Sequence, residues 1–173
     1  MLSDFLDEYR RYRALGEKAI AQVPDDALNA LPHPDANSIA MLVRHVGGNL
    51  ASRFTNFLAE DGEKPWRQRD TEFETRDYTR AEVDEWWARG WSVLEREVGA
   101  LADADLARTV HIRGQPLTVH QALCRSLAHV AMHVGQIVLL AREAAGDRWQ
   151  TLSIPKGKSA EYNRSPTLEK RPH

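Results

Sequence analysis

The sequence predicts an all-α fold: a four-helix bundle with a long crossover between helices 2 and 3 and a small β-hairpin before helix 4. Apolar residues recur at spacings of three and four in four segments, which is the pattern of amphipathic helices. A charged stretch without this period separates the second segment from the third, and a short alternating stretch precedes the fourth. Helices with one apolar face each bury those faces by packing together, which favours a bundle.

The first helix is expected to begin at Ser3, a residue that can cap it, and to extend to Val23. Pro24 ends it, because proline has no backbone N–H to donate to a helical hydrogen bond. Residues 25–31 add one short turn, and the prolines within 32–35 indicate a loop.

The second helix should begin after Asn37 or Ser38 as the N-cap and extend to Leu58. His45 lies in its middle, and two glycines follow at 47–48. A glycine in a helix interior costs roughly 1 kcal/mol relative to alanine. That cost is tolerated where another helix or a ligand must come close.

A polar stripe surrounds His45 on this helix. The residues within about 40° of it on a helical wheel are Ser38, Asn49, Ser52 and Asn56. Such a stripe on a helix otherwise rich in core residues indicates a site. The alternative is a solvated face, with the core on the other side of the helix.

Residues 60–79 form a charged connection without a helical pattern. A connection of about 18 residues is long for adjacent antiparallel helices, which usually need roughly 2–8. We therefore expect it to cross over the bundle, with Trp66 anchoring it to apolar surface. The functional alternative is a lid over a pocket.

The third helix opens with the capping-box spacing of Thr79 and Glu82 and extends to about Leu101. Its apolar face is rich in tryptophan: Trp86, Trp87 and Trp91. Core packing is the first interpretation of this face. Tryptophan enrichment also suits a dimer interface.

A hairpin is expected at 109–118, where apolar and polar residues alternate around a central Arg113-Gly114. Two short strands are unstable alone, so they should pack against the bundle. Thr118 then caps the fourth helix, and Gly146 ends it.

Residues 1–165 are expected to form a single domain, followed by a flexible C-terminal tail at 166–173. Within the domain, residues 149–158 have no helical period, and Leu152 and Ile154 could attach this segment to the bundle.

Composition excludes several classes of function. The chain has 173 residues, 28% of them charged, with a net charge of −2, which gives no electrostatic case for nucleic-acid binding. Its N-terminus lacks the features of a signal peptide, and no apolar run suggests a membrane span. The single cysteine, Cys124, suits a reducing compartment, so a cytoplasmic location is expected. We interpret Cys124 as a small buried hydrophobe rather than a nucleophile or ligand.

His129 and His133 are the strongest candidates for chemistry. Residues four apart lie on one helix face, so both imidazoles could reach one metal ion at roughly 2.0–2.1 Å. Residues 130–132 lack the glutamate that a zinc protease needs as general base, which argues against that function. The alternative is a pair of hydrogen-bonded core histidines.

The neighbours of this pair favour a wet pocket over a dry core. The residues within about 60° of His129 on the helical wheel are Arg125, Ser126 and Gln136. Three other histidines are not expected to join the pair: His120 falls on the opposite side of the helix, and His33 and His111 lie outside the predicted helices.

If helices 2 and 4 face each other, His45, His129 and His133 supply three neutral imidazoles to one ion. Three protein ligands leave a position for water or substrate, as in catalytic rather than structural sites. Imidazoles suit zinc, nickel, copper or iron. The polar residues that could support the ligands with hydrogen bonds are Asn49, Ser52 and Gln136.

Residues 38–45 and 129–137, the second with its two histidines followed by Gly-Gln, resemble the DinB/YfiT-like superfamily. The likeness extends from residue 3 to about residue 150. It implies a four-helix bundle, a mononuclear site formed by His45, His129 and His133, and frequent dimers. Characterised members include thiol S-transferases and a mycothiol-dependent isomerase, and many members have no known activity. Met132 and Val134 stand where many members carry a further histidine or an arginine, so the resemblance indicates fold and metal better than reaction.

The expected function is therefore that of a metal-dependent enzyme that transfers a low-molecular-weight thiol to an electrophilic small molecule. A metal-bound thiol loses its proton and becomes a nucleophile at neutral pH. Arg53 or Arg125 could orient the carboxylates of the thiol cosubstrate, or could form surface salt bridges instead. A divalent transition metal (zinc, nickel or iron) is the expected cofactor, and the chain is expected to be a homodimer. The alternatives are a metal-dependent hydrolase and a non-catalytic dimeric bundle that binds a metal or a small molecule.

Overall fold

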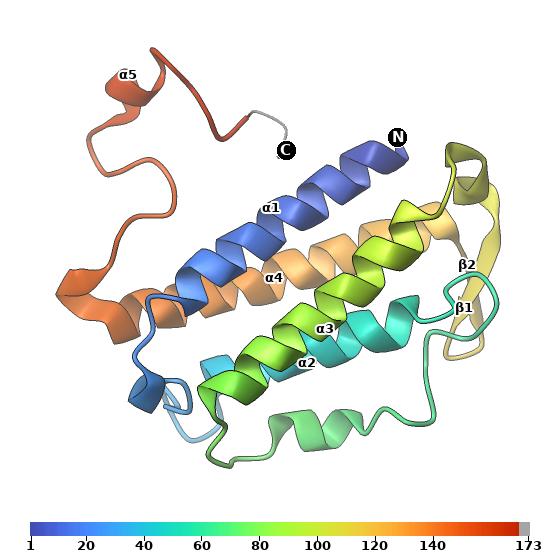
Figure 1. Cartoon of the computed structure of the whole chain (residues 1–173), viewed down its shortest axis with the longest axis horizontal. Helices are drawn as coiled ribbons and strands as arrows, with labels where there is room; N and C mark the ends of the chain where they lie inside the picture. The colour runs from blue at the N-terminus through green and yellow to red at the C-terminus, as the bar shows by residue number, and fades with distance from the viewer. Residues whose placement is uncertain (170–173) are drawn as a thin grey trace.

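Four long helices lie in two adjacent pairs, with α1 beside α4 and α2 beside α3 (Figure 1). The computed structural model describes residues 1–169, and helix α2 also packs against α4. The α-helices of this part of the chain are α1 (Leu2–Ile20), α2 (Ile39–Phe54), α3 (Arg80–Gly99), α4 (Val119–Ala145) and α5 (Ser159–Tyr162). The strands are β1 (Thr109–Ile112) and β2 (Gln115–Thr118), and the 3₁₀ helices are η1 (Asp25–Ala27), η2 (Arg69–Phe73), η3 (Asp103–Ala107) and η4 (Gly146–Arg148). The protein is thus mostly helical, with a small antiparallel hairpin directly before α4.

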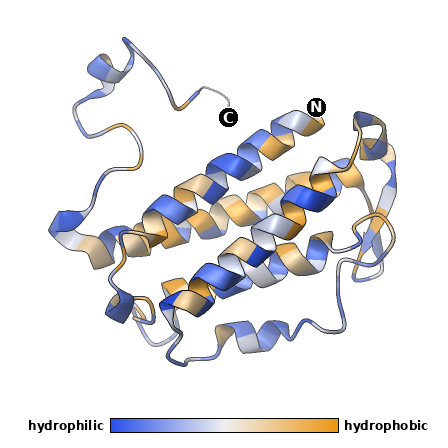
Figure 2. Cartoon of the chain, in the orientation of Figure 1, coloured by the Kyte–Doolittle hydropathy of each residue, from blue (hydrophilic) through white to orange (hydrophobic). Residues whose placement is uncertain are grey.

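The core is formed by buried apolar residues of the long helices, along which hydrophobic and hydrophilic residues alternate (Figure 2). Trp87 and Trp91 are buried, which supports the core interpretation of the tryptophan face of α3. Tyr9 of α1 is fully buried, and its hydroxyl donates a hydrogen bond of 3.0 Å to the Leu123 carbonyl of α4. This bond satisfies the one polar group that Tyr9 brings into the core.

Other parts of the chain come close to α2 at both of its glycines. The energetic cost of glycine within a helix predicts such close approaches. A Cβ added to Gly90 of α3 would lie 2.6 Å from Cα of Gly47, and a Cβ on Gly47 would overlap the carbonyl of Trp86. A Cβ on Gly48 would overlap the carboxylate of Glu72. Gly47 therefore admits another helix, and Gly48 admits a polar side chain from the connecting segment.

Three predicted N-caps are confirmed, but Ser3 is not a cap: α1 begins at Leu2 with Met1 as its N-cap, and it ends at Ile20 rather than Val23. Ser38 accepts a hydrogen bond of 3.2 Å from the Met41 amide at the start of α2. Thr79 and Thr118 each form a complete capping box, with Glu82 and Gln121 respectively. These side chains occupy the backbone donors that a helix start leaves unpaired.

The hairpin is confirmed as well, and it is tied to the connecting segment. Its turn holds Arg113 at φ 54° and Gly114 at φ 71°. The carboxylate of Asp61 accepts hydrogen bonds from both amides, at 2.8 and 2.7 Å. The first part of the long connection therefore packs on the hairpin before the chain turns back along α2 and α3 (Figure 1).

Three expectations about the second helix, the connection and Cys124 are wrong. Helix α2 ends at Phe54 rather than Leu58: Thr55 leaves the helical conformation at ψ 123°, and Asn56 follows in a left-handed conformation at φ 50°, which asparagine tolerates. Trp66 is 49% exposed and does not anchor the connection. Cys124 is exposed rather than buried.

The chain after α4 extends away from the four long helices (Figure 1). Leu152 packs against the core, as expected, but the short helix α5 was not predicted from the sequence. Residues 170–173 of the predicted flexible tail lie outside the described residues.

Helix α4 is also the one segment, within residues 1–169, that is long and apolar enough to cross a membrane by length and composition. It packs against α1 and α2, and core helices of soluble proteins meet the same criterion. The expectation that the protein does not associate with membranes stays a prediction.

Candidate metal centre

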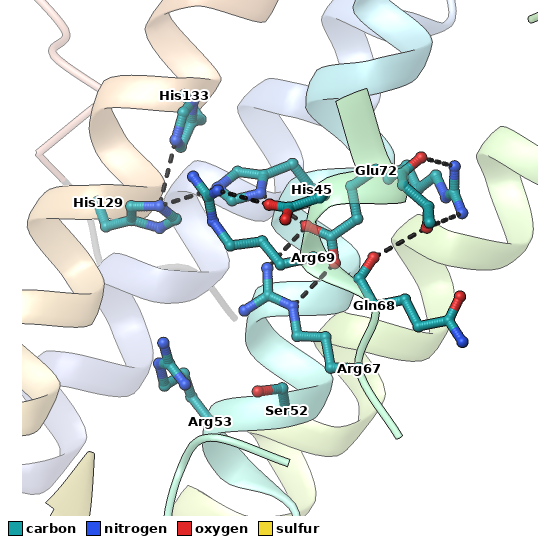
Figure 3. A network of polar contacts seen from close by, with 12 residues as sticks. His45, Ser52, Arg53, Arg67, Gln68, Arg69, Glu72, His129 and His133 are labelled. Atoms are coloured by element: carbon teal, nitrogen blue, oxygen red, sulfur yellow. Dashed lines mark hydrogen bonds and ion pairs between the residues drawn. The ribbon is translucent and has the colours of Figure 1, made fainter. Parts of the chain in front are cut away.

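The structure brings His45, His129 and His133 together. His45 comes from the middle of α2, and the other two are one turn apart on α4. The Nε2 atom of His129 lies 3.2 Å from Nε2 of His45 and 3.2 Å from Nε2 of His133 (Figure 3). One ring nitrogen from each of the three residues falls within 4.8 Å of the others, so the three could hold a metal ion.

Hydrogen bonds orient two of the three rings. Nδ1–H of His45 donates to Oε2 of Glu72 at 2.8 Å, and Nδ1–H of His133 donates to Oε1 of Gln136 at 2.8 Å. Both acceptors require the proton on Nδ1, so the neutral imidazoles direct their Nε2 lone pairs at His129. Nδ1 of His129 is buried and has no hydrogen-bond partner among the described residues.

This donor set fits a divalent transition metal. Nitrogens bound to a tetrahedral ion at roughly 2.0–2.1 Å lie about 3.3 Å apart, close to the two separations of 3.2 Å found here. Lone pairs aimed at one point repel each other unless a cation or a proton lies between them. Three protein ligands also leave a position for a further ligand. The geometry does not select zinc, nickel, copper or iron.

Burial keeps the imidazoles of His129 and His133 neutral. Burial lowers the pKa of His129 to about 4, and the neighbouring His133 and His45 act in the same direction. Burial also lowers the pKa of His133, against the opposing effect of its bond to Gln136. Because a metal binds the neutral ring, these shifts leave the cluster ready for a cation at neutral and mildly acidic pH.

Glu72 is the functional residue that sequence reasoning missed. It comes from η2 in the long connection, 27 residues from His45 along the chain, and both side chains are about 5% exposed. Arg67 donates two hydrogen bonds of 2.8 Å to the carboxylate of Glu72 (Figure 3). Burial alone would raise the pKa of Glu72, but the bonds from His45 and Arg67 lower it, so the group is ionised. The connection therefore supplies a buried anion to the candidate metal centre, besides crossing the helices.

A cavity of about 510 Å³ lies beside the cluster, and His45 and His129 form part of its wall. Two of the predicted supporting residues reach this region: Asn49 lines the cavity, and Gln136 bonds His133. Ser52 does not, because its hydroxyl donates to the carbonyl of Gly62 at 2.7 Å. The cavity is also lined by Arg53 and Arg125, the arginines expected near the site.

The other histidines within residues 1–169 lie elsewhere, as predicted. His120 packs its ring edge-on against Phe5 of α1, with a centroid distance of 5.5 Å, and lies 3.9 Å from Sγ of Cys124. His33 and His111 are exposed in a loop and on β1. The candidate centre is thus formed by His45, His129 and His133. That they bind a metal stays a prediction.

Comparisons with known proteins identify relatives of the fold without assigning an activity. A family model described as "Protein of unknown function (DUF1572)" matches residues 1–158. The structure is similar to the crystal structure titled "conserved protein of locus from Enterococcus faecalis", with a TM-score of 0.60 and 18% identity. That match covers 84% of this chain and 96% of the other, and at this identity it supports the fold alone. No curated protein matches the chain in sequence.

Proposed function

The chain belongs to the DUF1572 family, and from this premise we propose that it is a metal-dependent enzyme of the DinB/YfiT type that transfers a low-molecular-weight thiol to an electrophilic small molecule. One observation carries the proposal. Three imidazole nitrogens lie within 4.8 Å of one another, with that of His129 3.2 Å from each of the other two, beside a cavity large enough for a small substrate. A centre that held a metal for stability alone would close around the ion, and this one borders open space.

A bound divalent metal (zinc, nickel or iron) would supply Lewis acidity and lower the pKa of a thiol that reaches it. His45, His129 and His133 would hold the ion, while Glu72 and Gln136 keep two of the rings in the required tautomer. Phe54, Phe57 and Ile112 line the cavity and would exclude water around the electrophile. In the transfer, a sulfur–carbon bond forms, the leaving group departs with its bonding electrons, and the thiol proton passes to solvent.

Two features favour an external thiol over the hydrolytic alternative. The chain's own cysteine, Cys124, lies beside His120, so the nucleophilic sulfur has to come from a cosubstrate. No aspartate or glutamate of the described chain lines the cavity, and Glu72 is already bonded to His45 and Arg67. A thiol, which is far more acidic than water, is the nucleophile that least needs a side-chain base. Homodimer formation and a cytoplasmic location stay predictions.

The test begins with the metal content of protein purified without an affinity tag. We expect about one transition-metal ion per chain in the wild type, none in His129→Ala, and an unchanged content in His120→Ala, an exposed histidine of the same helix. Turnover of 1-chloro-2,4-dinitrobenzene with cysteine or glutathione should then require the metal. Equal rates in metal-loaded and metal-depleted protein would dismiss thiol transfer. Metal binding without turnover of this or related electrophiles would favour the non-catalytic alternative.

A further inference from the structure

We propose that the cavity beside the histidine cluster binds an organic anion, a carboxylate or phosphate group carried on an apolar body. The inference names the substrate class of the proposed enzyme and rests on that function only for the role of the ligand. The binding itself depends on the cavity and can be measured without metal.

The charged side chains that line the cavity, apart from its histidines, are all positive. Its lining contains no aspartate or glutamate among the described residues. Five guanidinium groups line it instead, from four different parts of the chain: Arg53, Arg67, Arg69, Arg113 and Arg125. Like charges gathered in one hollow repel each other, so such a set is maintained at a cost unless an anion joins it.

Only some of these charges are neutralised within the protein. Glu63 is shared by Arg53, at 3.2 Å, and Arg113, at 2.8 Å. Arg67 is paired with Glu72, which also serves His45. Two carboxylates therefore form ion pairs with three of the five guanidinium groups. Neither carboxylate lines the cavity.

Arg69 and Arg125 are left for a ligand. The nearest carboxylate to Arg69 is that of the fully exposed Asp70, at 3.5 Å, which contributes little. Arg125 has no hydrogen bond or ion pair within residues 1–169. Arg69 comes from η2 and Arg125 from α4, and Figure 3 shows Arg69 and Arg67 beside His45 and Glu72. Guanidinium groups bind carboxylate and phosphate with paired, charge-assisted hydrogen bonds, so these groups are the matching ligand chemistry.

The rest of the lining requires an apolar body on the same ligand. Phe54, Phe57 and Ile112 line the cavity, and so does Met132, whose side chain is 55% exposed. A small hydrated anion would leave these side chains in contact with water, whereas an organic anion would cover them. His129 belongs to the same wall, so such a ligand would bind beside the candidate metal centre.

The experiment compares three probes with one hydrocarbon body, titrated into metal-depleted full-length protein by calorimetry: 4-phenylbutyrate, 4-phenylbutyramide and 4-phenylbutylamine. We expect the carboxylate to bind at least about tenfold more tightly than the neutral amide, since a charge-assisted bond contributes this much, and the amine to bind most weakly. Phenethyl phosphate distinguishes the two anion classes. If it binds more tightly than the carboxylate, the ligand is a phosphate.

Arg69→Gln and Arg125→Gln should each weaken carboxylate binding several-fold. Both side chains are substantially exposed, so these variants should fold normally. Arg142→Gln, an exposed arginine of α4 that does not line the cavity, is the matched control and should bind like the wild type. Equal affinity for the acid and the amide, or unchanged affinity in both variants, would overturn the inference.

The outcome separates this inference from the proposed function. If the protein binds the anion but takes up no metal, the inference of an anion site holds and the proposed metal-dependent enzyme is contradicted. Normal metal uptake with no preference for the anion would remove the inference and leave the metal centre in place.

Discussion

At the scale of single residues, the candidate centre depends on a contact that joins two distant segments. His45 faces the other histidines with one ring nitrogen and Glu72 with the other. A carboxylate in this position fixes the tautomer of the ring and raises its basicity as a ligand. Gly48 leaves the space that the Glu72 carboxylate occupies.

Glu72→Gln should weaken metal binding by about 10–100-fold, the range found when such supporting residues are replaced. The amide keeps the shape of the side chain but removes the charge that His45 and Arg67 share. Competition with a chromophoric chelator measures the affinity, and circular dichroism checks that the variant is folded. Glu74→Gln, an exposed glutamate of the same segment, is the control. An affinity for metal equal to that of the wild type would show that Glu72 has no part in the centre.

Residue types and local spacing predicted the histidines and Gln136, because a helix places residues three and four apart on one face. Glu72 could not be predicted in this way, since it lies in a segment without periodicity. Two features of the sequence indicate only indirectly that a residue of this segment approaches α2: the connection is unusually long, and a glycine at position 48 leaves space beside the helix. Ser52 shows the limit of the same reasoning, because it shares the stripe of His45 yet bonds to Gly62.

At the scale of the elements, the position of the centre depends on how closely α2 and α3 approach each other. Backbone meets backbone where Gly90 faces Gly47, two residues after His45. This contact holds the middle of α2 against α3, so the opposite side of α2 can present His45 to α4.

Gly90→Ala should destabilise the protein by about 1–3 kcal/mol, the usual cost of overpacking a core. The added methyl would lie 2.6 Å from the Gly47 backbone, which cannot rotate away. Chemical denaturation in urea measures the change. Gly135→Ala in α4 meets nothing within 4 Å, so it should be neutral or stabilise by up to about 1 kcal/mol through helix propensity. If the two substitutions had the same effect, the close approach would have no energetic importance.

At the scale of the whole molecule, burying three imidazoles together makes stability depend on pH. The pKa of His129 is about 4 in the folded protein, against an ordinary value of 6.5 in the unfolded chain. Between these two values the unfolded chain binds more protons than the folded protein. Stability without metal therefore falls as pH decreases from 6.5 towards 4 and is unaffected by this group above pH 7.

We expect the free energy of unfolding of the metal-depleted protein to fall between pH 7 and pH 5, by an amount on the order of 1–2 kcal/mol. Carboxylates contribute little in this window, because the shifted ones have pKa values below their ordinary range. Urea denaturation at the two pH values measures the change, and His129→Asn should reduce it. A pH dependence that is the same in the variant would mean that His129 is not held neutral by its surroundings.

The sequence alone determined the long helices, the caps of α2, α3 and α4, and the hairpin, because periodicity, capping residues and turn residues act over a few neighbouring positions. It also determined that His129 and His133 share a face, which follows from the pitch of one helix. Only the tertiary structure decided that His45 meets them, that Glu72 stands behind His45, and that five arginines line one cavity. These contacts join residues tens of positions apart, and they depend on which helix faces fit together, a property that no local pattern encodes.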